Sequence, residues 1–346
     1  MTAVTVLMAV RDGAAFLEPA LETLREQTLG DFEFLVVDDG STDETPQILS
    51  AKAAADPRLK IIRKDGPGNL AASLNLGLRH ADTELVARAD ADDLYEPERL
   101  ATQVAEMHAR PSLGVLSCGF RRIDAKDRVL SVNPPIIGVD QIRFELLFHN
   151  CILHPGTIFR KAVVMDVDGY DERYWRAQDT DLWTRLRTKT EIDNQPDILV
   201  SYREHSAAVT QLKFRDGDNF IEDISIRALR PYTGGALDDD TLRAGNRLYG
   251  SRYRTTLSAA DIQAGLTALS HVCRTAKRRE PKHIYDRFRK AVAKALLHQA
   301  ELQDADGRRD VARKCSAQAF RWAPGPFAAR RYASTFGKSR NAAALR

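Results

Sequence analysis

The sequence predicts an α/β protein with a doubly wound, mostly parallel sheet, helices on both faces of that sheet, and a helical domain at the C-terminal end. Two observations lead to this prediction. Short β-rich apolar runs alternate with stretches of helical spacing through residue 118, which is the pattern of a parallel sheet with crossover helices. Strand signals almost vanish from residue 221 onward, where Ala, Leu and Arg recur at helical spacing.

The alternation in the N-terminal part can be followed element by element. Apolar runs predict strands at residues 4–10, 32–37, 59–62, 85–87 and 115–118. Helices are expected between them at residues 16–24, 45–54, 70–78 and 98–107, with Pro97 in the first turn of the last one. Loops at the carboxyl ends of such strands are where doubly wound sheets bind ligands.

The second half of the chain is less regular. Pro134 and Pro135 mark a loop, residues 139–148 read as a helix, and residues 156–160 read as a further strand. Helices are expected near the C-terminal end at residues 284–303 and 309–321. We therefore expect one α/β domain at residues 1–214 and a basic helical domain at residues 215–346.

The charge of the chain is unevenly distributed. Residues 241–346 hold 23 Lys or Arg against 7 Asp or Glu, whereas residues 1–240 hold 28 against 41, although the net charge is only +3. A basic block of this kind can meet nucleic acid, anionic lipid headgroups or a phosphorylated acceptor, and a solvated helical face is an equal alternative. Of these partners we expect peripheral contact with an anionic membrane and no nucleic acid.

Cysteine usage and the apolar runs bear on the compartment. The four cysteines form no CxxC pair and lack metal-ligand spacing, which favours buried, reduced thiols. The first apolar run ends at Arg11 and Asp12, so it predicts a strand rather than a signal peptide. No stretch of about 18 apolar residues runs without a charge, so no membrane-spanning helix is expected. We expect a cytoplasmic protein, with any membrane contact on the cytoplasmic face.

The first candidate site is the segment from Val36 to Thr45, in which an apolar strand delivers Asp38 and Asp39 into a Gly-Ser turn before a helix. A carboxylate in this position can accept from the imide or amino hydrogens of a nucleobase, and we assign that role to Asp39. Residues 41–43 are expected to be structural, because Ser, Thr and Asp commonly cap a following helix.

The same segment has a rival interpretation as the nucleophile loop of haloacid-dehalogenase-type phosphatases. That loop places two Asp residues one apart, whereas Asp38 and Asp39 are adjacent. Adjacent side chains in extended backbone point to different sides of the chain, so one could not act as nucleophile with the other as its acid partner. The phosphatase interpretation is therefore disfavoured.

The second candidate site holds three carboxylates, Asp90, Asp92 and Asp93, at the end of a predicted strand. Carboxylates this close repel one another unless a cation neutralises them. Asp90 and Asp92 are separated by one residue and point to the same side of extended backbone, and their hard oxygen atoms suit Mg²⁺ or Mn²⁺. Asp93 is expected instead to cap the helix that Pro97 opens.

The third candidate site is the segment from Tyr170 to Trp183, where carboxylates alternate with aromatic residues. Flat apolar faces beside a carboxylate are what a sugar-binding cleft needs, with the carboxylate accepting a hydroxyl proton. Asp179 is the candidate base. Asp181 is expected to favour the N-terminus of a helix, and Trp183 to lie in the core.

The fourth candidate site is a short strand that ends at Arg203, Glu204 and His205. His205 could complete the coordination of a carboxylate-bound divalent ion while Arg203 pairs with phosphate. His154, in Leu153-His154-Pro155-Gly156, either lines the cleft or braces a turn.

With these residues in place, the chain resembles the family 2 glycosyltransferases, which are inverting enzymes of the GT-A fold, over about residues 3–210. Four motifs occur in the family's order: an opening strand and helix at residues 6–27, a base-binding turn at residues 38–41, a metal motif at residues 90–92, and an Arg and His at residues 203–205. The resemblance implies a donor half at about residues 1–118 and an acceptor half at about residues 119–214.

The resemblance also implies a role for each matching residue. Asp179 would be the catalytic base, and Asp92, Asp90 and His205 would hold a divalent metal, Mg²⁺ or Mn²⁺, that bridges the diphosphate of a nucleotide-sugar donor. Residues that would contact the donor are Ala9, Arg11, Asp39, Asn75, Arg88, Asp90 and Arg203. The acceptor, a saccharide or a lipid-linked saccharide, would meet His154, Trp175 and Gln178.

Two positions depart from the family pattern. Gln178 stands where an acidic residue commonly precedes the base, which removes a second charge but spares Asp179. Gly66-Pro67-Gly68-Asn69 replaces the usual Asn, one residue, Gly ahead of the stretch that ends at Asn75, so a reshaped donor loop is expected.

The resulting prediction is an inverting, metal-dependent transferase that moves a sugar onto an acceptor hydroxyl in bacterial-type cell-surface polysaccharide or glycoconjugate synthesis. One alternative is a nucleotidyltransferase like the sugar-nucleotide pyrophosphorylases, although residues 9–13 are a poor version of the phosphate loop such enzymes need. Another is a non-catalytic module that binds nucleotide. A dinucleotide-dependent oxidoreductase is disfavoured, because no GxGxxG follows the first strand.

Overall fold

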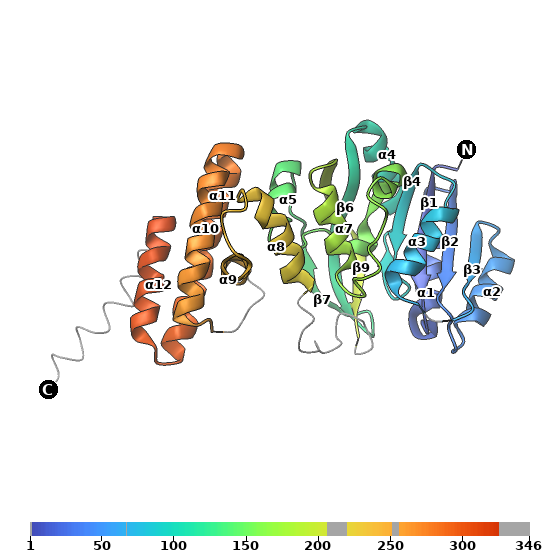
Figure 1. The fold of residues 1–346 in the computed structure, drawn as a ribbon. Coiled ribbons are helices and arrows are strands. Elements are labelled where there is room, and N and C mark those ends of the chain that lie inside the picture. Colours follow the sequence, from blue (N-terminus) through green and yellow to red (C-terminus); the bar gives the residue numbers. More distant parts are fainter. Residues whose placement is uncertain (1, 67, 206–219, 251–255, 325–346) are drawn as a thin grey trace. The chain divides into compact units, whose positions relative to one another are not determined.

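The computed structural model describes residues 2–66, 68–205, 220–250 and 256–324. The chain divides into two compact units, one made of residues 1–146 and 150–221 and the other of residues 147–149 and 222–346. The first unit holds a sheet with helices on both sides, and the second is helical (Figure 1). Each unit is described by itself.

The sheet of the first unit has nine strands in the described residues. Their order is β3-β2-β1-β4-β8-β6-β9-β5, with β7 paired to β6. The strands are β1 (Val4–Val10), β2 (Phe32–Asp38), β3 (Leu59–Arg63), β4 (Leu85–Ala89), β5 (Leu94–Tyr95), β6 (Leu113–Asp124), β7 (Val129–Asn133), β8 (Ile158–Arg160) and β9 (Glu191–Glu204).

The half of the sheet formed by β3, β2, β1 and β4 is entirely parallel, as the βαβ alternation predicts. In its register Val10 lies opposite Asp38, and Met8 lies opposite Ala89. The carboxyl ends of β1, β2 and β4 therefore meet at one edge of the sheet. The segments that begin at Arg11, Asp39 and Asp90 follow these ends, so this edge collects the first two candidate sites.

The other half of the sheet is mixed. Strand β8 pairs antiparallel with both β4 and β6, while β9 runs parallel to β6 for most of its length. The short strand expected before His205 is in fact the end of β9, which is 14 residues long and has register shifts along β6. Its polar start, from Glu191 to Asp197, hides the strand from a search for apolar runs.

Helices cover both faces of the sheet because side chains alternate along each strand. On β1, Val6 and Met8 pack with α1 (Ala14–Arg25), α2 (Thr45–Ala55) and α4 (Arg99–Ala109). Leu7 and Ala9 pack on the opposite face with α3 (Leu70–His80), α5 (Val139–Glu145), α6 (Lys161–Met165) and α7 (Gln178–Leu186). Gly77 lets α3 approach β1, since a Cβ there would lie 2.2 Å from Leu7 Cδ1.

Three predicted boundaries in this unit move. Helix α4 begins at Arg99 with Glu98 as its N-cap, so Pro97 precedes the helix instead of lying in its first turn. The helix expected at residues 139–148 is α5, which ends at Glu145. The strand expected at residues 156–160 is β8, which begins only at Ile158, because Gly156 ends a 3₁₀ turn, η1 (His154–Gly156).

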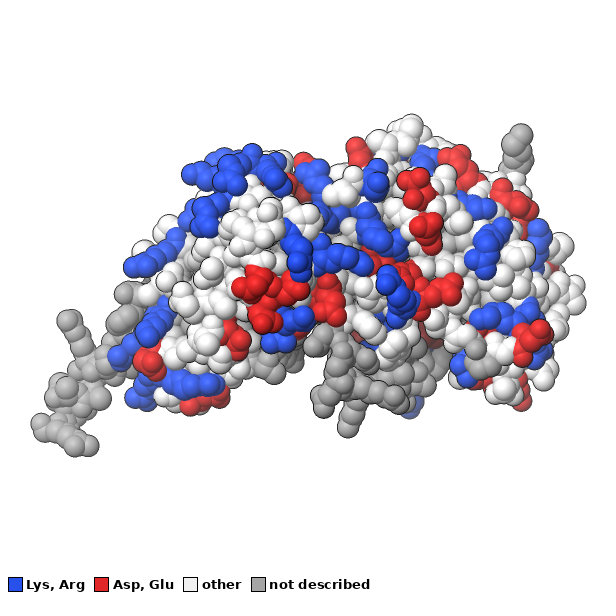
Figure 2. All heavy atoms as spheres, viewed as in Figure 1, with Lys and Arg blue, Asp and Glu red and all other residues white. Residues whose placement is uncertain are grey.

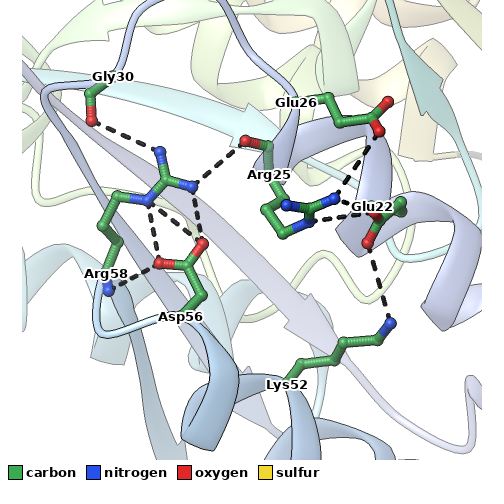
Figure 3. Close-up of polar contacts among 7 residues, drawn as sticks. All are labelled: Glu22, Arg25, Glu26, Gly30, Lys52, Asp56 and Arg58. Atoms are coloured by element: carbon green, nitrogen blue, oxygen red, sulfur yellow. Dashed lines mark hydrogen bonds and ion pairs between the residues drawn. The ribbon is translucent and has the colours of Figure 1, made fainter.

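A cluster of polar contacts fixes the C-terminal end of α1 against the loops around it (Figure 3). Arg58 forms an ion pair with Asp56 at 2.7 Å and donates from Nη2 to the carbonyl oxygen of Arg25 at 3.2 Å. Its guanidinium also lies over the Phe32 ring, 4.3 Å from the centroid. Carbonyl groups in the last turn of a helix lack intrahelical partners, so Arg58 satisfies a group that α1 leaves open.

The second unit contains α8 (Phe220–Tyr232), whose first two residues belong to the first unit, α9 (Asp239–Tyr249), α10 (Ala259–Arg279), α11 (Lys282–Ala305) and α12 (Arg309–Trp322). The helices predicted at residues 284–303 and 309–321 correspond to α11 and α12. Aromatic rings of Phe148, Tyr249, Phe288 and Trp322 contact one another in its core. None of the helices in the described residues is long and apolar enough to span a lipid bilayer.

Candidate active site

The loop after β1 is held by the turn after β2. The backbone N–H of Asp12 donates to Ser41 Oγ at 3.0 Å, Gly13 N–H donates to Thr45 Oγ1 at 2.9 Å, and Ala14 N–H donates to Asp43 Oδ2 at 3.0 Å. Residues 41–43 therefore have the structural role that the sequence predicts. Their side chains accept from free N–H groups at the start of α1. Asp43 also accepts from the backbone N–H of Thr45, at the start of α2.

Asp38 and Asp39 point to different partners, as adjacent residues in extended backbone should. Asp38 Oδ1 accepts from the backbone N–H of Ser41 at 2.9 Å. Asp39 is buried, and its Oδ1 forms an ion pair with Lys64 and accepts from Ser73 Oγ at 2.8 Å. Lys64 follows the end of β3 and is a site residue that the sequence analysis did not single out.

The segment that departs from the family pattern, residues 66–69, contacts Asp39. Gly68 donates its backbone N–H to both carboxylate oxygens of Asp39 at 3.1 Å. Gly40 has a φ of 75°, and a Cβ there would lie 2.8 Å from the carbonyl carbon of Gly66. The close approach of these two loops requires glycine at position 40. Pro67, within the departure, lies outside the described residues.

Asp90 is bound to a buried arginine. Arg88 Nη2 donates to Asp90 Oδ1, and the Arg88 side chain is fully buried while that of Asp90 is 27% exposed. Tyr95 closes the backbone around Asp90, because its Oη accepts from Asp90 N–H at 2.6 Å and donates to Asp90 O at 3.0 Å. Arg88 Nε and Nη1 have no hydrogen-bond partner among the described residues.

Asp92 contacts residues at the end of β9, as the sequence analysis predicted for His205. His205 Nε2 lies 2.9 Å from Asp92 Oδ2, and Arg203 Nε donates to the carbonyl oxygen of Asp92 at 2.7 Å. Arg203 is buried, and its guanidinium also reaches Asp124 O at 3.2 Å and forms an ion pair with Asp127. The structure thus brings together two residues that lie 113 positions apart in the chain.

Asp93 has a structural role different from the one expected. Its carboxylate is buried, does not cap α4, and accepts from the backbone N–H of Arg203 at 2.8 Å. Burial, with Asp92 and Asp90 nearby, raises the pKa of Asp93 well above its usual range. Asp93 therefore ties the end of β9 to the acidic turn.

The expected metal set is partly assembled. Among the described residues, no three His, Cys, Asp or Glu side chains come close enough to hold an ion together. Asp92 Oδ2 and His205 Nε2 are nevertheless 2.9 Å apart and both partly exposed. An octahedral ion with ligands at about 2.1 Å places adjacent ligands about 3 Å apart, so this pair fits two neighbouring positions. The carboxylate of Asp90 is bound to Arg88 instead.

Asp179 lies in the first turn of α7, where the helix dipole stabilises its charge. Asn150 Nδ2 donates to Asp179 Oδ2 at 2.7 Å. The Asn150 amide is itself oriented, because its Oδ1 accepts from the backbone N–H of Ile152 at 2.9 Å. Asn150 is the second site residue that the sequence analysis did not identify, since a single Asn in a loop carries no pattern.

The comparisons with known proteins agree on one family. The model described as "Glycosyl transferase family 2" matches residues 5–168. The first unit belongs to glycosyl transferase family 2. Similar proteins include the amylovoran biosynthesis glycosyltransferase AmsE of Erwinia amylovora, with 28% identity over 60% of this chain and 76% of the relative. The O-antigen biosynthesis glycosyltransferase WbnJ of Escherichia coli has 28% identity over 59% of this chain and 80% of the relative.

A solved structure confirms the fold. S. aureus TarS, residues 1–349 in complex with UDP-GlcNAc, has a TM-score of 0.60 and 20% identity, covering 89% of this chain and 90% of that TarS fragment. This glycosyltransferase therefore has the GT-A-type fold with a helical C-terminal region, which the sequence resemblance implied.

The remaining predicted residues of the glycosyltransferase occupy different positions around the site. Ala9 is buried near the end of β1, and the half-exposed Arg11 lies 3.7 Å from Asp12. Trp175 is exposed in the segment before α7, whereas Gln178 is buried. Asp181 lies in the first turn of α7 and Trp183 is fully buried, both as predicted. Asp181 also pairs with Arg185 at 2.7 Å.

His154 braces the site from within. It is buried, and its Nε2 lies 2.9 Å from Tyr170 Oη. Asn75 holds the backbone of Tyr170 from the other side, accepting from its N–H at 2.9 Å and donating to its carbonyl oxygen at 2.8 Å. Asn75, an expected donor contact, is thus bound to the segment that leads to Asp179.

The His154 environment makes the stability of the glycosyltransferase depend on pH. Burial and the nearby Arg88 lower the pKa of His154 well below 6.5. Above pH 6.5 the imidazole of His154 is neutral in both the folded and the unfolded chain. As the pH falls below 6.5, only the unfolded chain takes up a proton on this imidazole. The free energy of unfolding therefore falls by up to about 1.4 kcal/mol per pH unit. Urea unfolding at neutral and mildly acidic pH should show a steeper loss for the native chain than for His154→Gln. Equal slopes would contradict the assignment.

Proposed function

We propose that the protein is an inverting, metal-dependent glycosyltransferase that moves a sugar from a nucleotide-diphosphate sugar to an acceptor hydroxyl. The contact between Asp92 and His205 supports this proposal most directly, because it joins the metal motif of the donor half to the end of the last strand. The names of AmsE and WbnJ point to amylovoran and O-antigen synthesis, which favours a role in cell-surface polysaccharide or glycoconjugate synthesis. TarS, with the same fold, is solved with UDP-GlcNAc.

In this proposal the donor lies along the edge formed by the ends of β1, β2 and β4. Asp39 would accept from the nucleobase, with Lys64, Gly68 and Ser73 fixing its carboxylate. Asp92 and His205 would hold Mg²⁺ or Mn²⁺ through one carboxylate oxygen and one ring nitrogen. The ion would supply positive charge against the diphosphate that leaves. Arg203, which the sequence analysis paired with phosphate, would also position Asp92 by donating to the backbone carbonyl oxygen of Asp92.

The proposed chemistry is a single displacement. Asp179 takes the proton of the acceptor hydroxyl, whose oxygen forms a bond to the anomeric carbon as the bond from that carbon to the diphosphate oxygen breaks. The configuration inverts because attack comes from the face opposite the leaving nucleotide diphosphate. Asn150 would orient Asp179 for this step by holding one carboxylate oxygen.

The acceptor and the location belong to the same proposal. We propose a saccharide or lipid-linked saccharide as the acceptor, with Trp175 available as an exposed flat ring in the segment that leads to the base. The protein would act in the cytoplasm, with its basic C-terminal half touching an anionic membrane.

Donor binding is the first experiment. A panel of nucleotide sugars, tested with Mn²⁺ or Mg²⁺ by thermal unfolding, should contain one that raises the Tm, since ligand at about 100 times its Kd adds about 2.7 kcal/mol of stability. Asp39→Ala should lose this rise. Asp65→Ala is the matched control, because it removes an exposed carboxylate near the same loop, and it should keep the rise. An unchanged rise in Asp39→Ala would exclude Asp39 as a donor contact.

A further inference from the structure

The N-terminal half of α11 exposes a row of basic residues. His283, Arg287, Lys290 and Lys294 are all exposed, and their spacing of four, three and four residues places them on one face of the helix. The row covers 11 residue steps, which is about 17 Å at the rise of an α-helix. We call these four residues the α11 row.

The end of α10 extends the α11 row. Arg274, Lys277 and Arg278 are exposed in the last turns of α10, which leads into α11 through Glu280 and Pro281. Residues 274–294 hold nine Lys or Arg and two acidic residues. Figure 2 shows Lys and Arg side chains gathered at the end of the helical unit where α10 passes into α11.

Acidic side chains do not neutralise the α11 row. Asp286 forms an ion pair with Lys282 at 2.5 Å, and Glu280 accepts from Tyr232 Oη at 3.1 Å. Within the part of the chain that the structure describes, no carboxylate lies within ion-pair distance of Arg287, Lys290 or Lys294. The row therefore presents its charge to solvent.

Helix stability does not account for this arrangement. Cations in the last turn of α10 are favoured by the helix dipole, which explains Lys277 and Arg278 without any partner. The Lys and Arg residues of the α11 row lie beyond the first turn of the helix and far from its last turn, where the dipole has little effect. A solvated face normally mixes both signs of charge, and this row contains one.

We propose that the α11 row, with Arg274, Lys277 and Arg278, docks on the surface of a bilayer that contains anionic lipids. A straight row of long basic side chains can contact a plane of phosphate headgroups, each adding about fivefold to the partition coefficient. Single-stranded nucleic acid is a poorer fit, because exposed aromatic rings for base stacking are absent from the row. The proposal narrows the membrane contact to named residues and does not depend on the glycosyl transfer reaction.

The test is sedimentation of the full chain with phosphatidylcholine vesicles, with and without phosphatidylglycerol. We expect binding to the mixed vesicles alone, weakened by salt. Arg287→Glu with Lys290→Glu should lower the partition coefficient about thirtyfold or more. The matched control is Arg79→Glu with Lys126→Glu, which makes the same change of charge on exposed residues of the first unit and should keep most of the binding.

Three outcomes would overturn the docking proposal. They are equal binding to neutral vesicles, equal losses in the two double variants, and preferential binding of a nucleic acid over the mixed vesicles. Turnover of a nucleotide sugar in the absence of vesicles separates this proposal from the proposed function. Loss of vesicle binding with unchanged turnover supports docking at the row, whereas vesicle binding without any turnover leaves docking intact and removes the transferase proposal.

Discussion

Asp179→Asn is expected to reduce glycosyl transfer about 10³-fold while leaving donor binding unchanged. Removal of a general base typically costs 10² to 10⁴ in rate, roughly, and Asn has nearly the same shape as Asp but cannot take a proton at neutral pH. The Asn150 amide can still donate to the side-chain oxygen at this position, so the local structure should survive. Product formation at saturating donor measures the loss, and the thermal shift with the donor measures binding.

Asn150 provides the second arm of this experiment. Asn150→Ala removes the donor at 2.7 Å from Asp179 but leaves the carboxylate in place, so its effect on kcat should be smaller than that of Asp179→Asn. The charged form of Asp179 loses a hydrogen bond in this variant, so the acid limb of the kcat/KM profile should move to higher pH. Asn150→Ser, which keeps a donor, should recover part of both effects.

Two outcomes would contradict the assignment of Asp179 as the catalytic base. If Asp179→Asn loses donor binding as well as transfer, then Asp179 supports the structure of the donor site and is not the base. If instead transfer is nearly unchanged, another group must take the acceptor proton. In either case the Asn150 variants would show no shift of the pH profile.

The parallel half of the fold was predictable because its signals are local. Strands β1, β2 and β4 are mostly apolar, and Pro or Asn near the starts of α2 and α3 mark where those helices begin. The strands of the mixed half of the sheet were harder to predict from the sequence. Strand β9 starts with polar residues, and strand β5 has only two residues, too few to show a pattern. Their position depends on pairing between distant segments, which spacing along the chain does not encode.

The candidate site divides in the same way. Asp39, Asp90 and Asp92 could be found because each follows an apolar strand, and the ends of parallel strands share an edge. Lys64 and Asn150 could not be found, because their importance lies in a contact with a carboxylate 25 or 29 residues away. Arg203 was predicted from its place at the end of a short strand, but its buried contacts with the Asp92 carbonyl oxygen and Asp127 required the structure.

Chelation of divalent metal is expected to reduce transfer about 10³-fold, and Asp92→Ala should do the same without chelator. A metal at a diphosphate contributes several kcal/mol to the transition state, and about 1.4 kcal/mol corresponds to tenfold in rate. Adding Mn²⁺ or Mg²⁺ back should restore the native chain but not Asp92→Ala. Direct Mn²⁺ titration of each chain supplies a measurement of binding that does not depend on turnover.

The decisive comparison is between Asp92→Ala and Asp93→Ala, which lie side by side in the same turn. Asp93 is buried and accepts from the backbone N–H of Arg203, so loss of this acceptor in Asp93→Ala should lower the stability of the fold while Mn²⁺ still binds. Asp92 is partly exposed and 2.9 Å from His205 Nε2, so its replacement should abolish Mn²⁺ binding with a smaller effect on stability. If the contact with His205 were only a surface ion pair, chelation would leave transfer unchanged, and the two variants would differ in stability alone.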